Sequence, residues 1–343
     1  MKKTSFISAL GGVTSSKVHS LTFMSPKSPP GLLQSCHRLI MTAPLQSALV
    51  VLNSTSGAGG ADATRESITS RLQQSNVEVE FLTLDDGLDL AAEVRRHFAT
   101  GVTLVIAVGG DGTVNAVGNA IRDLPVRLGV LPLGTLNHFA RDLGIPLDLE
   151  AALDVVVAGH TMPVDAAEVN GRIFINNSSV GLYPRIVLLR ERYQRRNADK
   201  WIVAAWATLR VMRTGRPLRV QLTVEGGQIM RTTPLVFIGN NAYRMAGFEA
   251  GSRESLQGGT LALYVVKTTG RWRLLRLFWR ILARTAQRSG ELAMLMTPTA
   301  TIDVPGDASV TRMEVATDGE VIVLDLPLMY RSLPGAFDVC VPR

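Results

Sequence analysis

Apolar and polar positions follow different patterns in the two halves of this chain. Up to about residue 160, short apolar runs typical of buried strands alternate with segments of helical periodicity. This alternation predicts a parallel sheet with helices on both faces, in a Rossmann-like α/β domain over residues 43–165. The expected strands that bear on function lie at residues 48–52, 79–82, 104–108 and 128–131.

Beyond Gly171 strand patterns dominate, which predicts a β-rich second domain of β-sandwich type over residues 166–343. A helical block at 186–213 interrupts these strands and is expected as an insertion. The last segment of the chain could return to the first domain. The expected strands lie at residues 173–176, 219–225, 233–239, 261–266, 301–304 and 313–324.

Residues 1–42 are rich in Ser, Thr, Lys and Pro and show no sustained period. We expect a disordered leader or an extended start, with Met41 as a plausible native start, because the apolar patch is too short for a convincing signal peptide. The 343 residues, 46% of them hydrophobic, suit about two domains, and no run approaches the ~18 apolar residues of a membrane span. Two cysteines, Cys36 and Cys340, suit a reducing cytoplasm.

The expected strand 104–108 ends in Gly109-Gly110-Asp111-Gly112-Thr113, and a helical pattern follows. Glycines at such a turn let backbone N–H groups approach an anion, and the helix N-terminus adds partial positive charge, so the turn suits phosphate. Asp111 would repel a phosphate unless a cation lay between them. This combination indicates phosphoryl transfer with a divalent ion. The alternative is an ordinary turn whose aspartate caps the helix.

Two further turns repeat this design. The apolar run 48–52 ends in the polar loop 53–57, and the run 128–131 ends in Pro132-Leu-Gly134-Thr135-Leu-Asn137. The carboxyl ends of parallel strands share one edge of a sheet, and open α/β sheets bind their ligands at that edge. The three turns therefore predict a single ligand site.

These motifs resemble those of the diacylglycerol kinase catalytic-domain family, which includes bacterial lipid kinases and sphingosine and ceramide kinases. The family pattern is an Asn-containing glycine loop, then GGDGTxN, then PLGTxNxFA, and near the end Asp-Gly-Glu. The chain carries these motifs at 53–57, 109–115, 132–140 and 318–320, in that order. Residues 164–181 also look like the first strands of the family's second domain.

This resemblance implies an ATP-dependent lipid kinase that uses Mg²⁺, with Asp111 acting through the nucleotide-bound magnesium. Asp318 would be the base that receives the hydroxyl proton, and Glu320 would support it or the metal. Without the resemblance, Asp318-Gly319 would be interpreted as a hairpin turn. The residues implied to hold the nucleotide are Asn53, Ser54, Thr55, Ser56, Gly57, Thr83, Gly109, Gly110, Asp111, Gly112, Thr113, Asn115, Gly134, Thr135 and Asn137.

Two positions depart from the family pattern. His138 stands where the family usually has an aspartate, and we expect a solvated or hydrogen-bonded variant there. Bacterial members often have Leu-Asp-Asp-Gly-x-Leu where this chain has Gln257 and Gly258. The family's acidic residues hold a structural magnesium, so we expect that site to be absent from this chain.

Positive charge is concentrated in the expected second domain. Residues 185–219 hold 10 Lys and Arg against 2 acids, and residues 267–288 hold 7 against none, in a chain of net charge +7. The residues Arg273, Arg276, Arg280 and Arg284 form one stripe of an expected amphipathic helix. Such a helix suits an anionic membrane at its inner face, or it is a core helix with a solvated arginine stripe. Nucleic acid is not expected, because no recognisable binding module accompanies the basic residues.

Three functions are compatible with the sequence. The leading one is a kinase acting on a hydroxyl of diacylglycerol or a related membrane lipid. The second is an NAD kinase, whose related fold shares the Gly-Gly-Asp-Gly-Thr turn but not the other lipid-branch motifs. The third is a non-catalytic nucleotide- or lipid-binding regulator, which the changes at His138, Gln257 and Gly258 keep open. A homodimer is compatible with each.

Overall fold

The computed structural model describes residues 47–53, 61–85, 87–194, 206–211, 217–244, 255–268, 291–305 and 310–343, with a few further positions between 215 and 280. The expectations for residues 1–42, for the loop residues Ser54, Thr55, Ser56 and Gly57, and for Arg284 lie outside these described residues.

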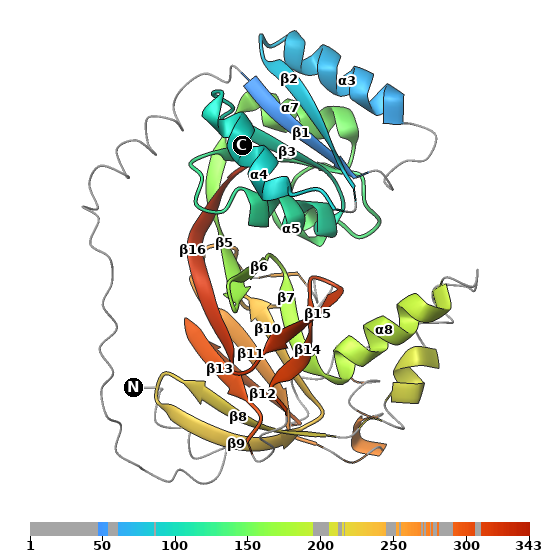
Figure 1. Ribbon diagram of the computed structural model, residues 1–343, viewed down its shortest axis with the longest axis vertical. Helices are drawn as coiled ribbons and strands as arrows, with labels where there is room; N and C mark the ends of the chain where they lie inside the picture. Colours follow the sequence, from blue (N-terminus) through green and yellow to red (C-terminus); the bar gives the residue numbers. More distant parts are fainter. Residues whose placement is uncertain are drawn as a thin grey trace.

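The first domain is a parallel α/β layer structure (Figure 1). Its strands pair in the order β2-β1-β3-β4, all parallel. Helices α3 and α7 contact each other over one side of this sheet, and α4 and α5 contact each other over the other. The strands are β1 (Ser47–Asn53), β2 (Glu78–Leu84), β3 (Leu104–Gly109) and β4 (Arg127–Pro132); the helices are α3 (Ala61–Gln73), α4 (Leu90–Ala99), α5 (Asp111–Ala120), α6 (His138–Asp142) and α7 (Leu149–Ala158).

The reason for this arrangement is visible in the burial of the strands. Every residue of β3 and β4 is buried, as expected of parallel strands covered on both faces. Helices α4 and α7 begin at aspartate caps, where Asp89 accepts a hydrogen bond from the Ala92 N–H and Asp148 from the Ala151 N–H. The expected Rossmann-like domain is confirmed.

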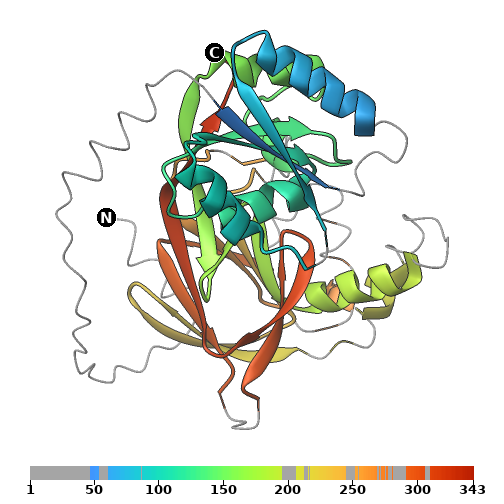
Figure 2. The same ribbon diagram turned by 45° about the horizontal axis from the view of Figure 1, so that its top comes forward.

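The second domain consists of two packed sheets, and the turned view of Figure 2 shows them face to face below the first domain. One sheet has the order β12-β11-β10-β7-β14-β15. The other continues the first domain's sheet from β4 through β16, β13 and β8 to β9. The members are β7 (Asn177–Gly181), β8 (Leu218–Val224), β9 (Gly227–Thr233), β10 (Leu235–Asn240), β11 (Leu261–Val266), β12 (Leu292–Thr297), β13 (Thr299–Asp303), β14 (Arg312–Thr317), β15 (Glu320–Asp325) and β16 (Leu328–Cys340).

Strand β16 belongs to both parts of the molecule. Its first half pairs with β13, and its last residues pair in parallel with β4, so the chain ends inside the first domain (Figure 1). It also pairs along its length with β5 (Thr161–Val169), which in turn pairs with β6 (Arg172–Phe174). The two long strands β5 and β16 therefore connect the domains. A buried apolar cluster fills the space between the two sheets.

The β-sandwich with inserted helices is confirmed, but some of its expected elements were wrong in detail. Residues 313–324 are not one strand: they form the hairpin β14–β15, which turns at Asp318-Gly319. Strands β9 and β12 were not expected. The expected helical block begins earlier, as α8 (Leu182–Gln194), and a second described helix covers residues 206–211. No helix among the described residues is long and apolar enough to cross a membrane.

Candidate active site

The first part of the site is a contact between two glycine turns. Gly110 follows β3 and Gly134 follows β4, and a Cβ added to Gly134 would lie 2.4 Å from the Gly110 Cα. A Cβ added to Gly109 would lie 2.3 Å from the Thr113 Oγ1. No larger residue fits at these positions, so the glycines are required for the two turns to meet. Asn137 holds the second turn, because its Nδ2 donates to the Pro132 and Gly134 carbonyl oxygens at 3.0 and 2.8 Å.

The neighbouring strands add polar side chains to this edge. The Asn53 Nδ2 at the end of β1 donates to the Thr113 Oγ1 at 3.5 Å. The Thr83 Oγ1 on β2 accepts a hydrogen bond from Arg65 Nη2 of α3 at 3.0 Å. Thr135 is exposed beside the second turn. The described nucleotide-binding candidates therefore gather at the carboxyl edge of the sheet, with one exception.

The exception is Asn115, which is buried within α5. Its Oδ1 accepts a hydrogen bond from Asn119 Nδ2 at 3.1 Å. Asn119 in turn binds the backbone of Ile173 in β6: its Nδ2 donates to the Ile173 carbonyl oxygen, and its Oδ1 accepts from the Ile173 N–H. Asn115 thus belongs to the contact between α5 and β6, and we missed the role of Asn119 although it lies one helical turn from Asn115.

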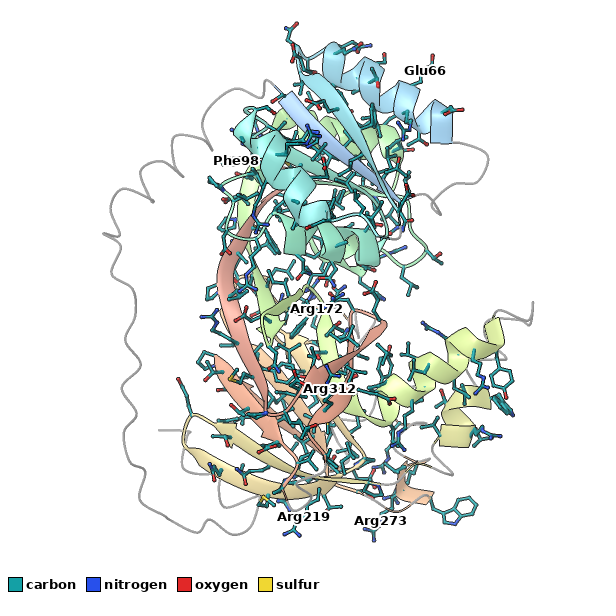
Figure 3. All side chains as sticks on the ribbon, in the orientation of Figure 1. Glu66, Phe98, Arg172, Arg219, Arg273 and Arg312 are labelled. Atoms are coloured by element: carbon teal, nitrogen blue, oxygen red, sulfur yellow. The ribbon has the colours of Figure 1, made fainter. Side chains whose placement is uncertain are left out.

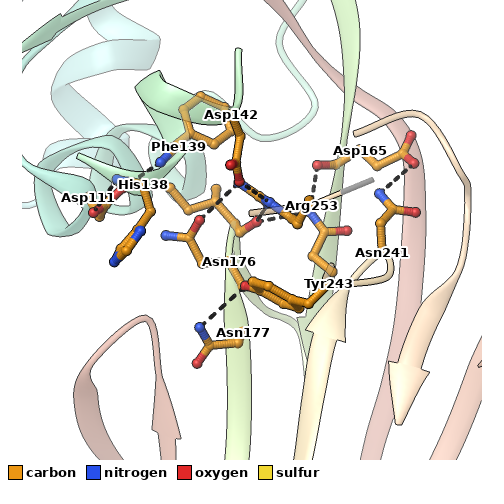
Figure 4. A network of polar contacts seen from close by, with 12 residues as sticks. Asp111, His138, Phe139, Asp142, Asp165, Asn176, Asn177, Asn241, Tyr243 and Arg253 are labelled. Atoms are coloured by element: carbon orange, nitrogen blue, oxygen red, sulfur yellow. Dashed lines mark hydrogen bonds and ion pairs between the residues drawn. The ribbon is translucent and has the colours of Figure 1, made fainter. Parts of the chain in front are cut away.

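The Asp111 carboxylate is held by the first turn of α6. Its Oδ2 accepts from the His138 N–H at 3.0 Å and its Oδ1 from the Phe139 N–H at 2.9 Å (Figure 4). Asp111 therefore caps a helix, as the alternative interpretation allowed, but the helix is α6 rather than its own. A carboxylate can accept about four hydrogen bonds. One lone pair on each oxygen is left for a metal ion or its bound water.

Asp318 occupies the two-residue turn between β14 and β15. Its φ is 49° and that of Gly319 is 90°, the positive values required by the hairpin turns that suit a twisted β-ribbon. Its Oδ1 accepts from the Asn176 and Asn177 N–H groups at 2.8 and 2.9 Å, and its Oδ2 accepts from the Ile175 N–H at 2.7 Å. The Asp318 N–H donates to the Asn177 carbonyl. Hydrogen bonds therefore fix this turn to the segment that connects β6 and β7. The Asp318 Oδ2 keeps one lone pair that can accept from a further donor.

Burial changes the acidity of this carboxyl. It raises the pKa of Asp318 from its usual range to about 6, because the partly buried carboxylate loses much of its hydration. The three backbone N–H groups and the Arg253 charge favour the ionised form and offset part of the effect. Asp318 is thus a stronger base than a solvated aspartate, and it is still mostly ionised at pH 7.

A chain of polar contacts joins the two aspartates across the domains, and Figure 4 shows its part between Asp111 and Asn176. Arg253 Nε donates to Asp142 Oδ2 of α6 at 2.7 Å, and Arg253 Nη2 donates to the Asn176 Oδ1 at 3.0 Å. The Arg253 side chain is 0% exposed and that of Asp142 is 9% exposed. The helix α6 that Asp111 caps is therefore tied to the segment that holds Asp318.

Three members of this network were not expected from the sequence. Asp142 and Arg253 lie outside every family motif that we used, and their partners are distant in sequence. Tyr243 donates its hydroxyl to the Asn176 carbonyl at 3.0 Å, and burial raises the pKa of Tyr243 to about 12. Only the Asp142 position, five residues after Asn137, could have been found by its nearness to a motif.

Glu320 and His138 are placed differently from Asp318. The Glu320 Oε2 accepts from Arg172 Nη2 at 3.3 Å and lies in an exposed pair on β6 and β15, where Figure 3 shows Arg172 in the region between the domains. The His138 side chain is exposed, and in Figure 4 its imidazole points away from the Asp111 carboxylate. Neither residue contacts Asp318 through a hydrogen bond among those the structure describes.

The second expected departure from the family pattern, at Gln257 and Gly258, lies beside a buried aspartate, Asp165. The Asp165 Oδ2 accepts from the Gly259 N–H at 2.7 Å and from Asn241 Nδ2 at 3.1 Å, and its Oδ1 accepts from the Gly335 N–H at 2.9 Å. A Cβ on Gly258 would lie 2.6 Å from the Asn241 Oδ1. Three N–H donors thus occupy three of the about four acceptor positions of this carboxylate, and Gln257 and Gly258 add no negative charge for a magnesium ion. Among the described residues, no three His, Cys, Asp or Glu side chains could hold a metal together.

Comparison with known proteins agrees with this geometry. The family described as "Diacylglycerol kinase catalytic domain" matches residues 47–169, and the "YegS C-terminal NAD kinase beta sandwich-like domain" matches residues 190–341. A Staphylococcus haemolyticus protein named diacylglycerol kinase is 28% identical over 307 residues, which is 86% of this chain and 88% of that protein. A Staphylococcus aureus protein of the same name is 28% identical over 304 residues, covering 86% and 92%.

Solved structures give the same answer. A provisionally named diacylglycerol kinase from Bacillus anthracis has 25% sequence identity and a TM-score of 0.67, covering 88% of this chain and 98% of that one. A second Bacillus anthracis structure, of a diacylglycerol kinase, shares the fold with a TM-score of 0.61 at 21% identity. The two family matches cover both domains. The chain is a member of the diacylglycerol kinase catalytic-domain family of lipid kinases.

Proposed function

We propose that this protein transfers the γ-phosphate of ATP to a hydroxyl of diacylglycerol or a related membrane lipid. The observation that carries the proposal is Asp318, a carboxylate with one open lone pair and a pKa of about 6, tied through Arg253 and α6 to the glycine turns. Phosphoryl transfer needs a held nucleotide and an acceptor hydroxyl next to a base. In this proposal the first domain would hold the nucleotide, and the second domain would provide the base beside the acceptor hydroxyl.

The glycine turns would hold the nucleotide phosphates, with Asn53, Thr83 and Thr135 at their rim. The open lone pairs of Asp111 suit a magnesium ion that arrives with the nucleotide, where it would neutralise phosphate charge. Asp318 would accept the proton of the lipid hydroxyl, and Arg253 would position the segment that holds Asp318. Glu320, which pairs with Arg172, would support Asp318 or the metal by adding negative charge near the acceptor.

The acceptor is proposed to be a lipid because the names of the relatives state diacylglycerol, and because the basic second domain suits an anionic membrane surface. We propose peripheral contact with the inner face of the membrane. The arginine stripe alone is a weak argument for this contact, since Arg276 pairs with Glu291 at 2.6 Å and Arg280 approaches the same carboxylate at 4.0 Å.

Phosphate transfer from labelled ATP tests the proposal. Purified protein would be incubated with Mg²⁺, ATP and either a total lipid extract, defined diacylglycerol vesicles or NAD. We expect label in the lipid fraction of the first two reactions and none on NAD. Label on NAD would support the NAD kinase alternative, and ATP binding without transfer to any acceptor would support the regulator.

A further inference from the structure

A second surface of the molecule combines exposed apolar and basic side chains. Helix α8 buries Leu182 and Val187 and exposes Arg185, Leu188 and Arg192, which lie at i, i+3 and i+7 on one face. The helix at 206–211 buries Ala207 and Val211 and exposes Trp206, Leu209 and Arg210. We call these six exposed residues the helical-pair face; its members are Arg185, Leu188, Arg192, Trp206, Leu209 and Arg210.

The two helices are fixed to each other through an aromatic contact. The Tyr193 and Trp206 rings lie edge to face, with centroids 4.7 Å apart and planes at 70°. The Arg210 guanidinium lies 5.3 Å from the centre of the Trp206 ring. This contact holds the indole on the helix pair with its outer part in solvent, since Trp206 is 40% exposed.

The composition of the helical-pair face identifies its partner. Leu188 and Leu209 are 39% and 46% exposed. Together with Trp206, they would leave three large apolar side chains in contact with water if no partner covered this face. Three arginines are exposed on the same two helices, and the sequence 182–211 holds seven basic against two acidic residues. Tryptophan and leucine beside arginine is the pattern of a helix that lies at the interface of an anionic bilayer. An acidic protein surface would match the charge but not the central apolar residues.

The position of this surface connects it with the candidate active site. Helix α8 begins at Leu182, directly after β7, and contacts β7, β14 and β15 (Figures 1 and 2). Asp318 lies in the turn between β14 and β15. The first residue of β7, Asn177, binds the Asp318 carboxylate. A bilayer that contacts the helix pair therefore lies on the acceptor side of the site rather than beside the nucleotide turns.

We propose that the helical-pair face is the membrane-docking surface of this protein, and that its partner is an anionic lipid bilayer. The proposal deepens the proposed function, because a docked enzyme would meet a lipid substrate at the surface where that substrate resides. It is independent of the arginine stripe at 273–284, part of which Glu291 neutralises.

Vesicle binding without ATP tests the proposal. The full chain would be sedimented with phosphatidylglycerol vesicles and with neutral phosphatidylcholine vesicles, at low and high salt. We expect binding to the anionic vesicles that weakens with salt. The variant with Arg185→Gln, Arg192→Gln and Arg210→Gln should lose about fivefold per arginine. Leu188→Ala with Leu209→Ala should lose about tenfold, with an unchanged melting temperature because both side chains are exposed.

Two variants outside the surface serve as controls. Arg219→Gln removes an exposed charge near the start of β8 (Figure 3), and Leu147→Ala removes an exposed leucine of the first domain, 41% exposed. Both should bind vesicles like the wild type. Equal losses in the controls, or wild-type binding by the helical-pair variants, would overturn the proposal. Dissociation of a dimer in these variants with vesicle binding unchanged would instead assign the face to a second copy of the chain.

The kinase reaction itself is read separately. Turnover of a short-chain diacylglycerol below its micelle concentration does not require docking, so the helical-pair variants should match the wild type on that substrate. Loss of turnover there would contradict a docking role. If the wild type phosphorylates no lipid, the proposed function fails, and the vesicle measurement still decides the docking surface.

Discussion

Asp111 and Asp318 are each the first residue of an Asp-Gly dipeptide, one in each domain. Each carboxylate accepts hydrogen bonds from backbone N–H groups of another segment of the chain. Asp111-Gly112 starts a helix, whereas Asp318-Gly319 makes a hairpin turn with two positive φ angles. Asp111 is held by two amides from α6, 27 and 28 residues away, and Asp318 by three amides more than 140 residues away. The difference shows that the surrounding fold, not the dipeptide, decides what such a carboxylate can do.

The sharpest test of this comparison removes the carboxylate of the nucleotide turn. Asp111→Ala should reduce phosphate transfer by more than about 10³-fold, because a phosphate site without it has no group to hold the cation. The variant also loses the cap of α6, about 1 kcal/mol, so its melting temperature must be measured beside its turnover. Asp123→Ala, at an exposed aspartate that follows α5, is the matched control and should keep wild-type turnover. Substantial transfer by folded Asp111→Ala would leave Asp111 with a capping role alone.

The connection between the two aspartates can be broken at Asp142. Asp142→Asn leaves the buried Arg253 without its charge partner, which should lower the free energy of unfolding by about 3–5 kcal/mol. Thermal or urea unfolding measures this loss. Asp154→Asn removes the surface partner of Arg71 and should change stability by less than about 1 kcal/mol. Equal effects of the two substitutions would show that the Arg253 pair does not hold the domains together.

Asp318 itself is tested by a change that keeps its shape. Asp318→Asn should lower kcat by about 10²-fold or more, since an amide cannot accept the hydroxyl proton. ATP binding, measured by titration, should stay near wild type because the nucleotide turns lie on the other domain. Asp325→Asn, at the exposed other end of β15, is the control. Wild-type turnover in folded Asp318→Asn would reduce Asp318-Gly319 to an ordinary turn.

The pH dependence of turnover tests Asp318 as the base. The pKa of Asp318 is raised to about 6, and the base must be deprotonated to act. The kcat should therefore rise with pH through about 6, and fall about tenfold per unit below that value. The residual activity of Asp318→Asn should lack this step. The sign for stability is the reverse: ionising a carboxyl whose pKa is raised on folding disfavours the folded state, so the contribution of Asp318 to stability is lost as pH rises through about 6.

The smallest expected effect concerns the junction at Asp165, where we predict that no structural metal is bound. Its carboxylate already accepts from the Gly259 and Gly335 N–H groups and from Asn241, and neither Gln257 nor Gly258 supplies a second carboxylate. Chelation with EDTA should therefore shift the melting temperature by less than about 1 °C, below the roughly 2–4 °C that 1 kcal/mol produces in a protein of this size. The nucleotide site provides the contrast, because the same chelation should stop phosphate transfer. A large fall in melting temperature would show that other residues bind a structural metal.

Local sequence was sufficient for the elements whose pattern and turn chemistry agree. Strands β1, β3 and β4 of the first domain were expected within about two residues of their observed limits, because these buried parallel strands are continuous apolar runs followed by glycine-containing turns. The hairpin turn at Asp318 was also available from its Asp-Gly pair. The antiparallel strands β9 and β12 were not, because their exposed positions interrupt the apolar pattern.

The sequence by itself determined the family, the order of the two domains and the residues of the glycine turns and the Asp-Gly-Glu hairpin. These features depend on short segments whose chemistry is complete within a few residues. Only the tertiary structure decided that Asp111 caps α6, that Asp142 and Arg253 join the domains, and that Asp318 lies in a partly buried turn that raises its pKa to about 6. Each of these features depends on partners that are far apart in the chain. Hydrogen bonding and desolvation depend on which groups are close in space, and the local sequence does not specify those groups.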